Sequence, residues 1–303
     1  MIRHHVDRFV QLQRALGRSF GEQEKALQQF AAFADDRSAT FLTTAQALEW
    51  AGQARSPNAA RTRFNQVRAF AVFVHGEDPR HEVPAAGLFG HGRRRRPAPY
   101  ILTPDQVTGI VQEALKVPWH SPISPLTYHH LFGLLAATGL RVSEALSLRC
   151  DDLTEDGLLV RSGKFGKDRL VPLHASTRAA LGQYLSARRG IIGANADLFI
   201  LGHGRAPTAT RAHVVFVRIV RRLGYRGQSG PGPRLHDLRH TFAVRSLEAC
   251  GHEPQAVLRH MRALSTYLGH ADIANTYWYL EATPVLLRTI ASVSEGAFLG
   301  GTA

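Results

Sequence analysis

The residues best suited to chemistry are arginines, histidines, a lysine and a tyrosine in four short segments between residues 137 and 282. One segment, RLHDLRH, places His236 and Arg239 three residues apart, so that both lie on one face of a helix. At a helix start such a pair can bind an anionic oxygen, because the helix dipole adds positive potential there. The alternative is that both side chains only pair with carboxylates of the core.

A second segment, ATGLRVSEALSLRCDDL, has an arginine at the junction of two expected helices. Arg141 follows a glycine that ends an apolar helix, and it precedes the next helix. A side chain at such a junction is held firmly and can still face a cleft, although a surface arginine is the simpler interpretation. We expect Glu144, one helical turn later, to be its local structural partner.

The third segment, SGKFGKD, has the composition of a turn between two short apolar runs. We expect Lys164 at the tip of this hairpin, from which an ammonium group can donate a proton to a leaving oxygen. Lys167, three residues later, is expected to be a solvated turn residue.

The fourth segment, LSTYLGHADIANTYWYLEA, places His270 after a glycine and Tyr279 nine residues later. A tyrosine hydroxyl is a weak nucleophile near neutral pH, and it becomes effective when cations surround the phosphate that it attacks. Tyr267 and Tyr277 are close by in the sequence, and packing is the default interpretation for both.

These segments require a scaffold that is mainly α-helical with one small β-hairpin, an α+β fold. Thr103, Pro104 and Gln106 form a helix start, with a cap, a first-turn proline and a capping-box glutamine. The runs 158–160 and 169–171 flank the third segment and predict the two strands. Further helices are expected at about 125–139, 143–148, 175–188, 208–223 and, with breaks, 235–293.

The N-terminal part of the chain predicts a separate bundle of four short helices. Its first helix is marked by apolar residues at helical spacing, namely Val6, Phe9, Val10, Leu12 and Leu16. Thr43 or Thr44 is expected to cap the third helix. Arg61, Arg63 and Arg68 lie on or near the fourth helix, where they are candidates for contacts with a phosphate backbone.

A stretch rich in proline, glycine and arginine follows this bundle. Residues 81–99 are typical of an extended linker. They include a run of arginines that is either solvated or in contact with a phosphate backbone: Arg93, Arg94, Arg95 and Arg96. We therefore expect a helical domain at 1–90, a basic linker at 91–99 and a second domain at 100–303.

The composition favours a polyanionic partner. Lysine and arginine number 37 against 24 acidic residues, and the net charge is +13. Nearly all of the basic residues are arginines, whose planar guanidinium group donates two parallel hydrogen bonds to phosphate. Biased codon usage is the alternative explanation for this enrichment.

Several other classes of protein are excluded by the sequence. The two cysteines, Cys150 and Cys250, are too far apart for a CxxC zinc site and indicate no disulfide scaffold. Adjacent histidine pairs lack the spacing of metal ligands, so no metal is expected. No apolar run is long enough to span a membrane, and the first residues lack a secretory signal. We expect a cytoplasmic, nucleoid-associated protein.

Together the four segments resemble the tyrosine recombinase (phage integrase) family. Its pattern has an arginine in a TGLRxSE segment, the first lysine of a GK-x-x-K hairpin, an H-x-x-R motif, and LGH followed nine residues later by the nucleophile. The matching residues are Arg141, Lys164, His236, Arg239, His270 and Tyr279. The resemblance covers nearly the whole chain. It implies a SAM-like core-binding domain before the catalytic domain.

The resemblance implies that Tyr279 attacks a DNA phosphodiester, forms a 3′-phosphotyrosyl bond and frees a 5′-hydroxyl group. It implies no metal and no ATP, since the covalent bond conserves the phosphodiester energy. The spacing selects Tyr279 over Tyr277, and a helix turns about 200° over two residues, so both cannot face one phosphate. His240 and Asp237 adjoin the motif and are not assigned to catalysis.

The resemblance also implies a role for each of the other matched residues. Arg141 and Arg239 would hold the non-bridging oxygens of a pentavalent phosphorane, and His270 would donate to one of them. His236 would act as an acid–base group near the tyrosine, and Lys164 would protonate the departing 5′ oxygen.

The family works as a tetramer on two double-stranded DNA sites and passes through a Holliday junction. The resemblance therefore implies dimers and tetramers on DNA, and a second recombinase is an open possibility. An apolar stripe at 284–301 is expected to dock on a neighbouring protomer or to pack on its own domain. We expect a two-domain layout without an arm-binding domain, and residues 274–284 resemble transposon-borne members. Integration, excision, transposition and dimer resolution all stay open.

Two other functions fit the same motifs less well. A type IB topoisomerase shares the nucleophilic chemistry, but the small helical first domain and short C-terminal helix fit a recombinase better. A catalytically silent DNA-binding regulator of the same fold is disfavoured by the complete set of six residues.

Overall fold

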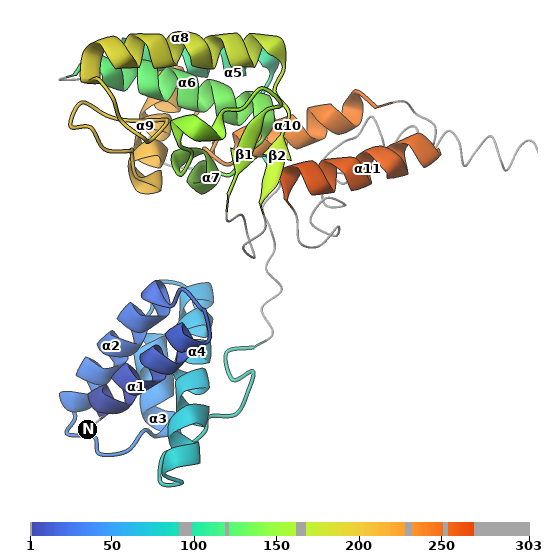
Figure 1. Ribbon diagram of the computed structural model, residues 1–303. Coiled ribbons are helices and arrows are strands. Elements are labelled where there is room, and N and C mark those ends of the chain that lie inside the picture. Colours follow the sequence, from blue (N-terminus) through green and yellow to red (C-terminus); the bar gives the residue numbers. More distant parts are fainter. Residues whose placement is uncertain are drawn as a thin grey trace, which may run out of the picture. The chain divides into compact units, whose positions relative to one another are not determined.

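The computed structural model describes residues 2–90, 99–118, 121–161, 168–227, 232–250 and 254–269. The chain divides into two compact units, Met1–Arg96 and Pro97–Ala303. The described part is mainly α-helical with one small two-stranded sheet, as expected (Figure 1). None of the helices in these ranges combines the length and the apolar character needed to cross a membrane.

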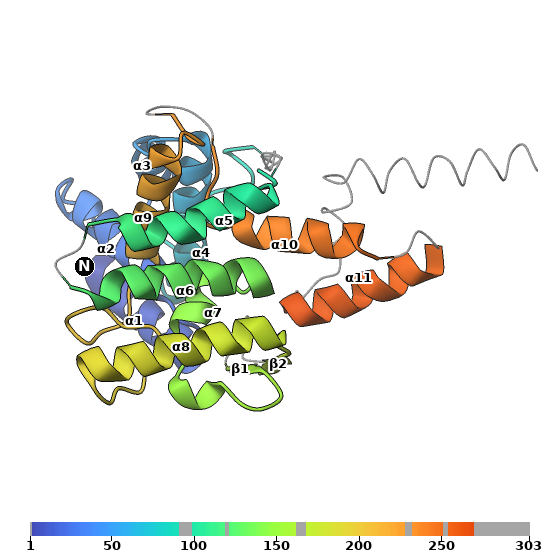
Figure 2. The same ribbon diagram turned by 90° about the horizontal axis from the view of Figure 1, so that it is seen from above.

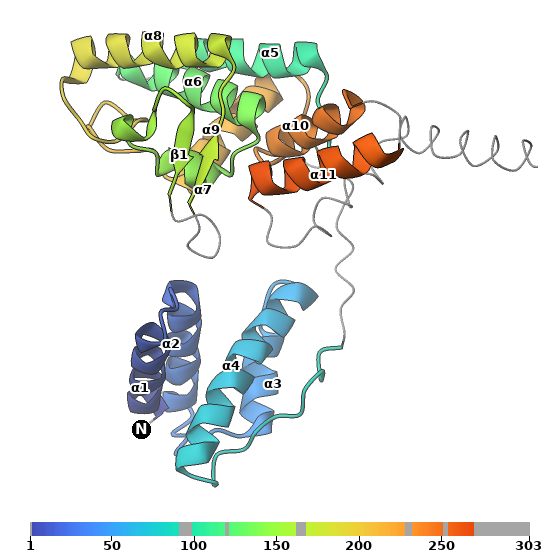
Figure 3. The same cartoon turned by 45° about the vertical axis from the view of Figure 1, so that its right-hand side comes forward.

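The described part of the first unit has four helices, which pack as two pairs (Figure 3): α1 (Ile2–Ala15) with α2 (Gly21–Asp35), and α3 (Thr44–Gly52) with α4 (Pro57–Glu77). Aromatic rings fill the space between them, among them Phe9, Phe30, Trp50, Phe64 and Phe70. Thr43 caps α3 in a capping box with Gln46, which decides between the two expected capping residues.

Two patterns in the sequence of this unit do not show where its core lies. Leu12 and Leu16 share the helical spacing of the first helix but are 42% and 62% exposed, because α1 covers the core with other residues and ends at Ala15. The stretch at 81–99 that is typical of an extended linker also packs on the bundle at its start. Residues 81–84 pack on the bundle, since the Leu42 amide donates to Nδ1 of the buried His81 at 3.0 Å, and Pro84 is buried.

The second unit is built around α6 (Ile123–Thr138), which is apolar on nearly all sides. Long helices pack on it (Figure 2): α5 (Pro104–Glu113), α8 (Ala175–Ile192) and α10 (Asp237–Glu248). The expected helix start at Thr103 is confirmed, because its hydroxyl accepts from the Gln106 amide and the Gln106 side chain accepts from the Thr103 amide. Helix α6 is therefore the buried central helix on which the neighbouring helices pack.

The described part of the second unit has seven further elements. They are the 3-10 turns η1 (Ala114–Lys116) and η2 (Cys150–Asp152), the helices α7 (Val142–Leu146), α9 (Ala209–Arg222) and α11 (Pro254–Leu268), and the strands β1 (Leu158–Val160) and β2 (Arg169–Val171). The strands pair antiparallel, with Leu158 opposite Val171, so the two expected strands are confirmed. Helices α10 and α11 lie side by side (Figures 1 and 2) and share a small apolar cluster.

Gly139 ends α6 and directs the chain toward Arg141. Its φ of +61° is in the left-handed region, where a glycine has no steric penalty. A Cβ atom at this position would also lie 2.6 Å from Cδ1 of Phe242. Both the backbone turn and the close approach of α10 therefore require a glycine here.

Replacement of Gly139 by alanine should lower the free energy of unfolding by about 2–4 kcal/mol, because it combines left-handed strain with overpacking. Gly182→Ala is the matched control. Gly182 lies on α8 with open space where a Cβ atom would lie, so this change should raise stability by about 0.5–1 kcal/mol. Denaturant unfolding of both variants checks the pair, and a neutral Gly139→Ala would contradict the packing described.

Candidate active site

Two arginines that are far apart in the sequence meet at the C-terminal end of α11. Arg141 precedes α7, and its Nη2 donates to the Gly269 carbonyl at 3.0 Å while its Nη1 approaches the Leu268 carbonyl at 3.4 Å. Arg239, buried in the first turn of α10, donates to the Leu268 carbonyl at 2.8 Å and to the Gly139 carbonyl at 2.6 Å. The two guanidinium groups thus share one carbonyl oxygen.

A buried glutamate fixes the first of these arginines. Glu144 accepts from the Arg141 backbone amide at 2.9 Å and from Nη1 of the same residue at 2.7 Å. Its expected role as a local partner of Arg141 is confirmed. Burial favours a raised pKa for Glu144, but hydrogen bonds from Arg169 and Arg141 outweigh it and lower the pKa to about 2. The carboxylate therefore stays ionised at neutral pH.

Arg169, at the start of β2, is a further member of this cluster that no motif singles out. Its Nη2 and Nη1 donate to the Glu144 carboxylate at 2.8 and 3.2 Å, and its Nε donates to the Tyr267 carbonyl at 2.9 Å. The only signal in the sequence is a basic residue at the start of a short apolar strand, beside the expected lysine hairpin. Tyr267 itself packs as expected, stacked on Phe242 with ring centroids 5.6 Å apart.

His236 lies beside the arginines, at the residue before α10. His236 is exposed, and its ring meets that of His240 edge to face, with centroids 4.6 Å apart. Partial burial and the charges of Arg239 and Arg141 lower the pKa of His236. Burial and the neighbouring His236 lower the pKa of His240 to about 3. Both imidazoles are therefore mainly neutral near neutral pH, and His236 is able to accept a proton.

The geometry thus brings together three of the six candidate catalytic residues, namely Arg141, His236 and Arg239. Comparison with known proteins shows the family to which the chain belongs. Residues 101–284 match the phage integrase family. The chain belongs to that family. An integrase/recombinase of Sinorhizobium fredii, y4rB, is 38% identical over 297 residues, which are 94% of this chain and 94% of that protein.

Two further comparisons agree with this family. Tyrosine recombinase XerD of Brucella suis biovar 1 is 30% identical over 250 residues, or 80% of this chain and 77% of XerD. The XerH site-specific recombinase, solved on its palindromic difH substrate, shares the fold with a TM-score of 0.64 and 20% identity, over 89% of this chain and 78% of XerH. The enzyme class indicated by the motifs, a site-specific tyrosine recombinase, is confirmed.

The remaining candidate site residues of this phage integrase family member fall into two groups. Some lie outside the described residues: Lys164, Lys167, His270, Tyr277, Tyr279 and the arginines Arg93, Arg94, Arg95 and Arg96. The others lie on α4. Arg61 donates to Asn58 at 3.0 Å, Arg63 lies over the Trp50 ring at 5.0 Å, and Nε of Arg68 donates to the Pro84 carbonyl at 2.9 Å. Arg68 therefore also holds the end of the N-terminal unit.

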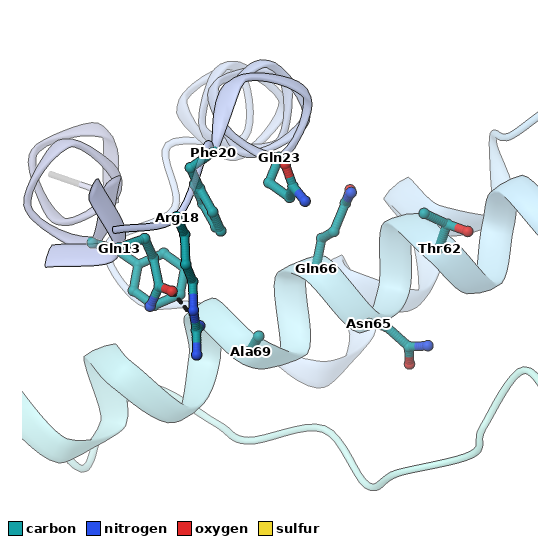
Figure 4. A pocket seen from close by; sticks show the side chains of 9 residues that line it. Gln13, Arg18, Phe20, Gln23, Thr62, Asn65, Gln66 and Ala69 are labelled. Carbon is teal, nitrogen blue, oxygen red and sulfur yellow. Dashed lines mark hydrogen bonds between the residues drawn. The ribbon is translucent and has the colours of Figure 1, made fainter. Parts of the chain in front are cut away.

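The N-terminal unit also has a hollow of about 410 Å³ between its first two helices and α4 (Figure 4). Four of its lining residues have amide side chains and none is acidic, and the whole set is Phe9, Gln13, Arg18, Phe20, Gln23, Thr62, Asn65, Gln66 and Ala69.

Replacement of Glu144 by glutamine should lower the free energy of unfolding at pH 7 by roughly 3 kcal/mol, because it removes the charge that binds two guanidinium groups. The pKa of Glu144 lies below its ordinary value of 4.5, so its contribution is complete above about pH 5. It should be lost as the pH falls toward 2. Urea unfolding of both proteins across this range measures the difference, and a gap that does not narrow in acid would contradict the assignment.

Proposed function

We propose that this recombinase cuts and rejoins double-stranded DNA through a 3′-phosphotyrosyl bond to Tyr279. One observation carries the proposal. Arg141 and Arg239 converge on the carbonyls of Leu268 and Gly269, and the next residue in the chain is His270. The segment that contains the nucleophile thus starts at the arginine cluster.

The described geometry suits the stabilisation of a pentavalent phosphorane. Arg141 is fixed by Glu144, and Arg239 is buried and bonded to two carbonyls. Such fixed cations act on the developing charge of the non-bridging oxygens without reorganising during the reaction. We assign His270 to donate a further hydrogen bond to these oxygens.

We assign the two proton transfers to His236 and Lys164. When the Tyr279 oxygen bonds to phosphorus, its proton passes to the neutral imidazole of His236, and the bond from phosphorus to the 5′ oxygen breaks. Lys164 supplies the proton that this departing oxygen takes up. A 5′-hydroxyl of the partner strand then attacks the phosphotyrosine and gives its proton to Lys164. The bond from phosphorus to the Tyr279 oxygen breaks, the tyrosine takes back its proton from His236, and the phosphodiester is restored.

DNA binding is assigned to both units. We assign residues 1–90 as a SAM-like core-binding domain, 91–99 as a basic linker along the phosphate backbone, and 100–303 as the catalytic domain. The arginines of α4 support this role for the first unit. Strand exchange then requires protomers on two DNA sites, assembled as dimers and a tetramer through a Holliday junction. XerH, which has the same fold, was solved on DNA.

The nucleophile can be identified with a nicked suicide duplex that contains sites from the flanks of the gene. The wild type and Tyr277→Phe should form a protein–DNA adduct that survives SDS, without added metal, and Tyr279→Phe should form none. If Tyr277→Phe is the variant that forms no adduct, the nucleophile is Tyr277 and not Tyr279. Tight binding without any adduct would favour a DNA-binding regulator, and relaxation of supercoils without joining of two sites would favour a topoisomerase.

Replacement of Arg61 by glutamine should weaken DNA binding uniformly across sequences and reduce the slope of log affinity against log salt by about 1, as expected for one lost phosphate contact. Arg80→Gln is the control, because Arg80 is exposed in the same unit but is bound to the carboxylate of Asp78 at 2.7 Å. Fluorescence anisotropy over a salt series measures both slopes. An equal change of this slope in the two variants would show that Arg61 does not contact the phosphate backbone.

A further inference from the structure

We propose that Arg169 is a positioning residue for DNA cleavage, which acts by holding Glu144 and the end of α11 so that Arg141 meets the phosphate correctly. This inference rests on the proposed function and adds a residue to it. Arg169 differs from the six matched residues because it acts through other groups of the protein.

The contacts of Arg169 join three parts of the catalytic unit. It starts β2, five residues after Lys164 in the sequence, and its side chain is only 13% exposed. Two of its nitrogens donate to Glu144, whose carboxylate also binds Arg141, and the third donates to the carbonyl of Tyr267 in α11. A single guanidinium group thus connects the strand after the lysine segment, the first catalytic arginine and the helix before His270.

The end of α11 is shaped to accept this guanidinium group. Gly269 has a φ of +65°, and a Cβ atom at this position would lie 2.9 Å from Nη1 and 3.0 Å from Cζ of Arg169. The backbone therefore turns directly against the guanidinium, at the residue that precedes His270. A shorter or uncharged side chain at position 169 would leave this turn without its support.

The charges around Glu144 explain why replacement of Arg169 should lower the rate of DNA cleavage. Glu144 is buried, and with Arg169 present its charge is divided between two guanidinium groups. Without Arg169, the whole carboxylate charge acts on Arg141. That arginine would then be drawn toward Glu144 and away from a bound phosphate. Misplacement of one group by about 1 Å is enough to reduce a rate about 100-fold.

The test compares Arg169→Gln and Arg169→Lys with the same two changes at Arg161. Arg161 follows β1, the partner strand of β2, is 56% exposed and pairs with Asp152 at 2.6 Å, so it is a matched control outside the cluster. Each variant is measured for DNA affinity and for the rate of adduct formation at saturating suicide duplex. Arg169→Gln should bind DNA within about threefold of the wild type and cleave about 100-fold more slowly. Arg169→Lys should recover part of the rate, and both Arg161 variants should cleave like the wild type.

A double variant tests whether Arg169 acts through Glu144. Glu144→Gln removes the charge that draws Arg141 away, so Glu144→Gln combined with Arg169→Gln should cleave no more slowly than Arg169→Gln alone. An effect of Arg169 that does not pass through Glu144 predicts an additive loss. Full cleavage by the Arg169 variants, a parallel loss of affinity, or equal effects at Arg161 would overturn the inference. A wild type that forms no adduct would instead refute the proposed function.

Discussion

The second unit depends on how three positively charged side chains are held beside the C-terminal end of α11. Among the described residues, three guanidinium groups gather there, and each donates to a carbonyl of residues 267–269. Carbonyls at a helix C-terminus have no partners within the helix, and they attract cations. Glu144 adds the carboxylate that keeps Arg141 and Arg169 together in a largely buried place. Without these acceptors, the repulsion among the arginines would oppose the fold.

The scaffold explains how such distant residues come together. The left-handed turn at Gly139 lets Arg141 follow α6 directly, and the packing of α10 on α6 brings Arg239 to the Gly139 carbonyl. The short β2 adds Arg169 from a third direction. Each arginine of the cluster is thus placed by the end of a regular element. The stability that holds the arginines in place comes from buried apolar contacts of α6, away from the polar cluster.

Much of this arrangement was predictable from the sequence, because the signals are local. The cap at Thr103, the end of α6 and the turn from Arg141 to Glu144 all depend on residues three to five positions apart. The pairing of Arg169 with Glu144 joins residues that are 25 positions apart and has no periodic pattern. Leu12 and Leu16 share the helical spacing of the buried residues and are nevertheless exposed, since helical spacing does not show where the core ends.

The balance of charge in the cluster has a consequence for catalysis. Arg141, Arg169 and Arg239 are three cations and Glu144 is one anion, so the four side chains together have two net positive charges. A phosphodiester in its ground state has one negative charge, whereas the phosphorane formed by tyrosine attack has a second one. Under the proposed mechanism, the net charge of these four side chains balances the charge of the phosphorane and exceeds that of the bound phosphodiester by one unit. An enzyme gains rate only from interactions that strengthen along the reaction, and the attraction between this cluster and the reacting phosphate would strengthen as the second negative charge develops.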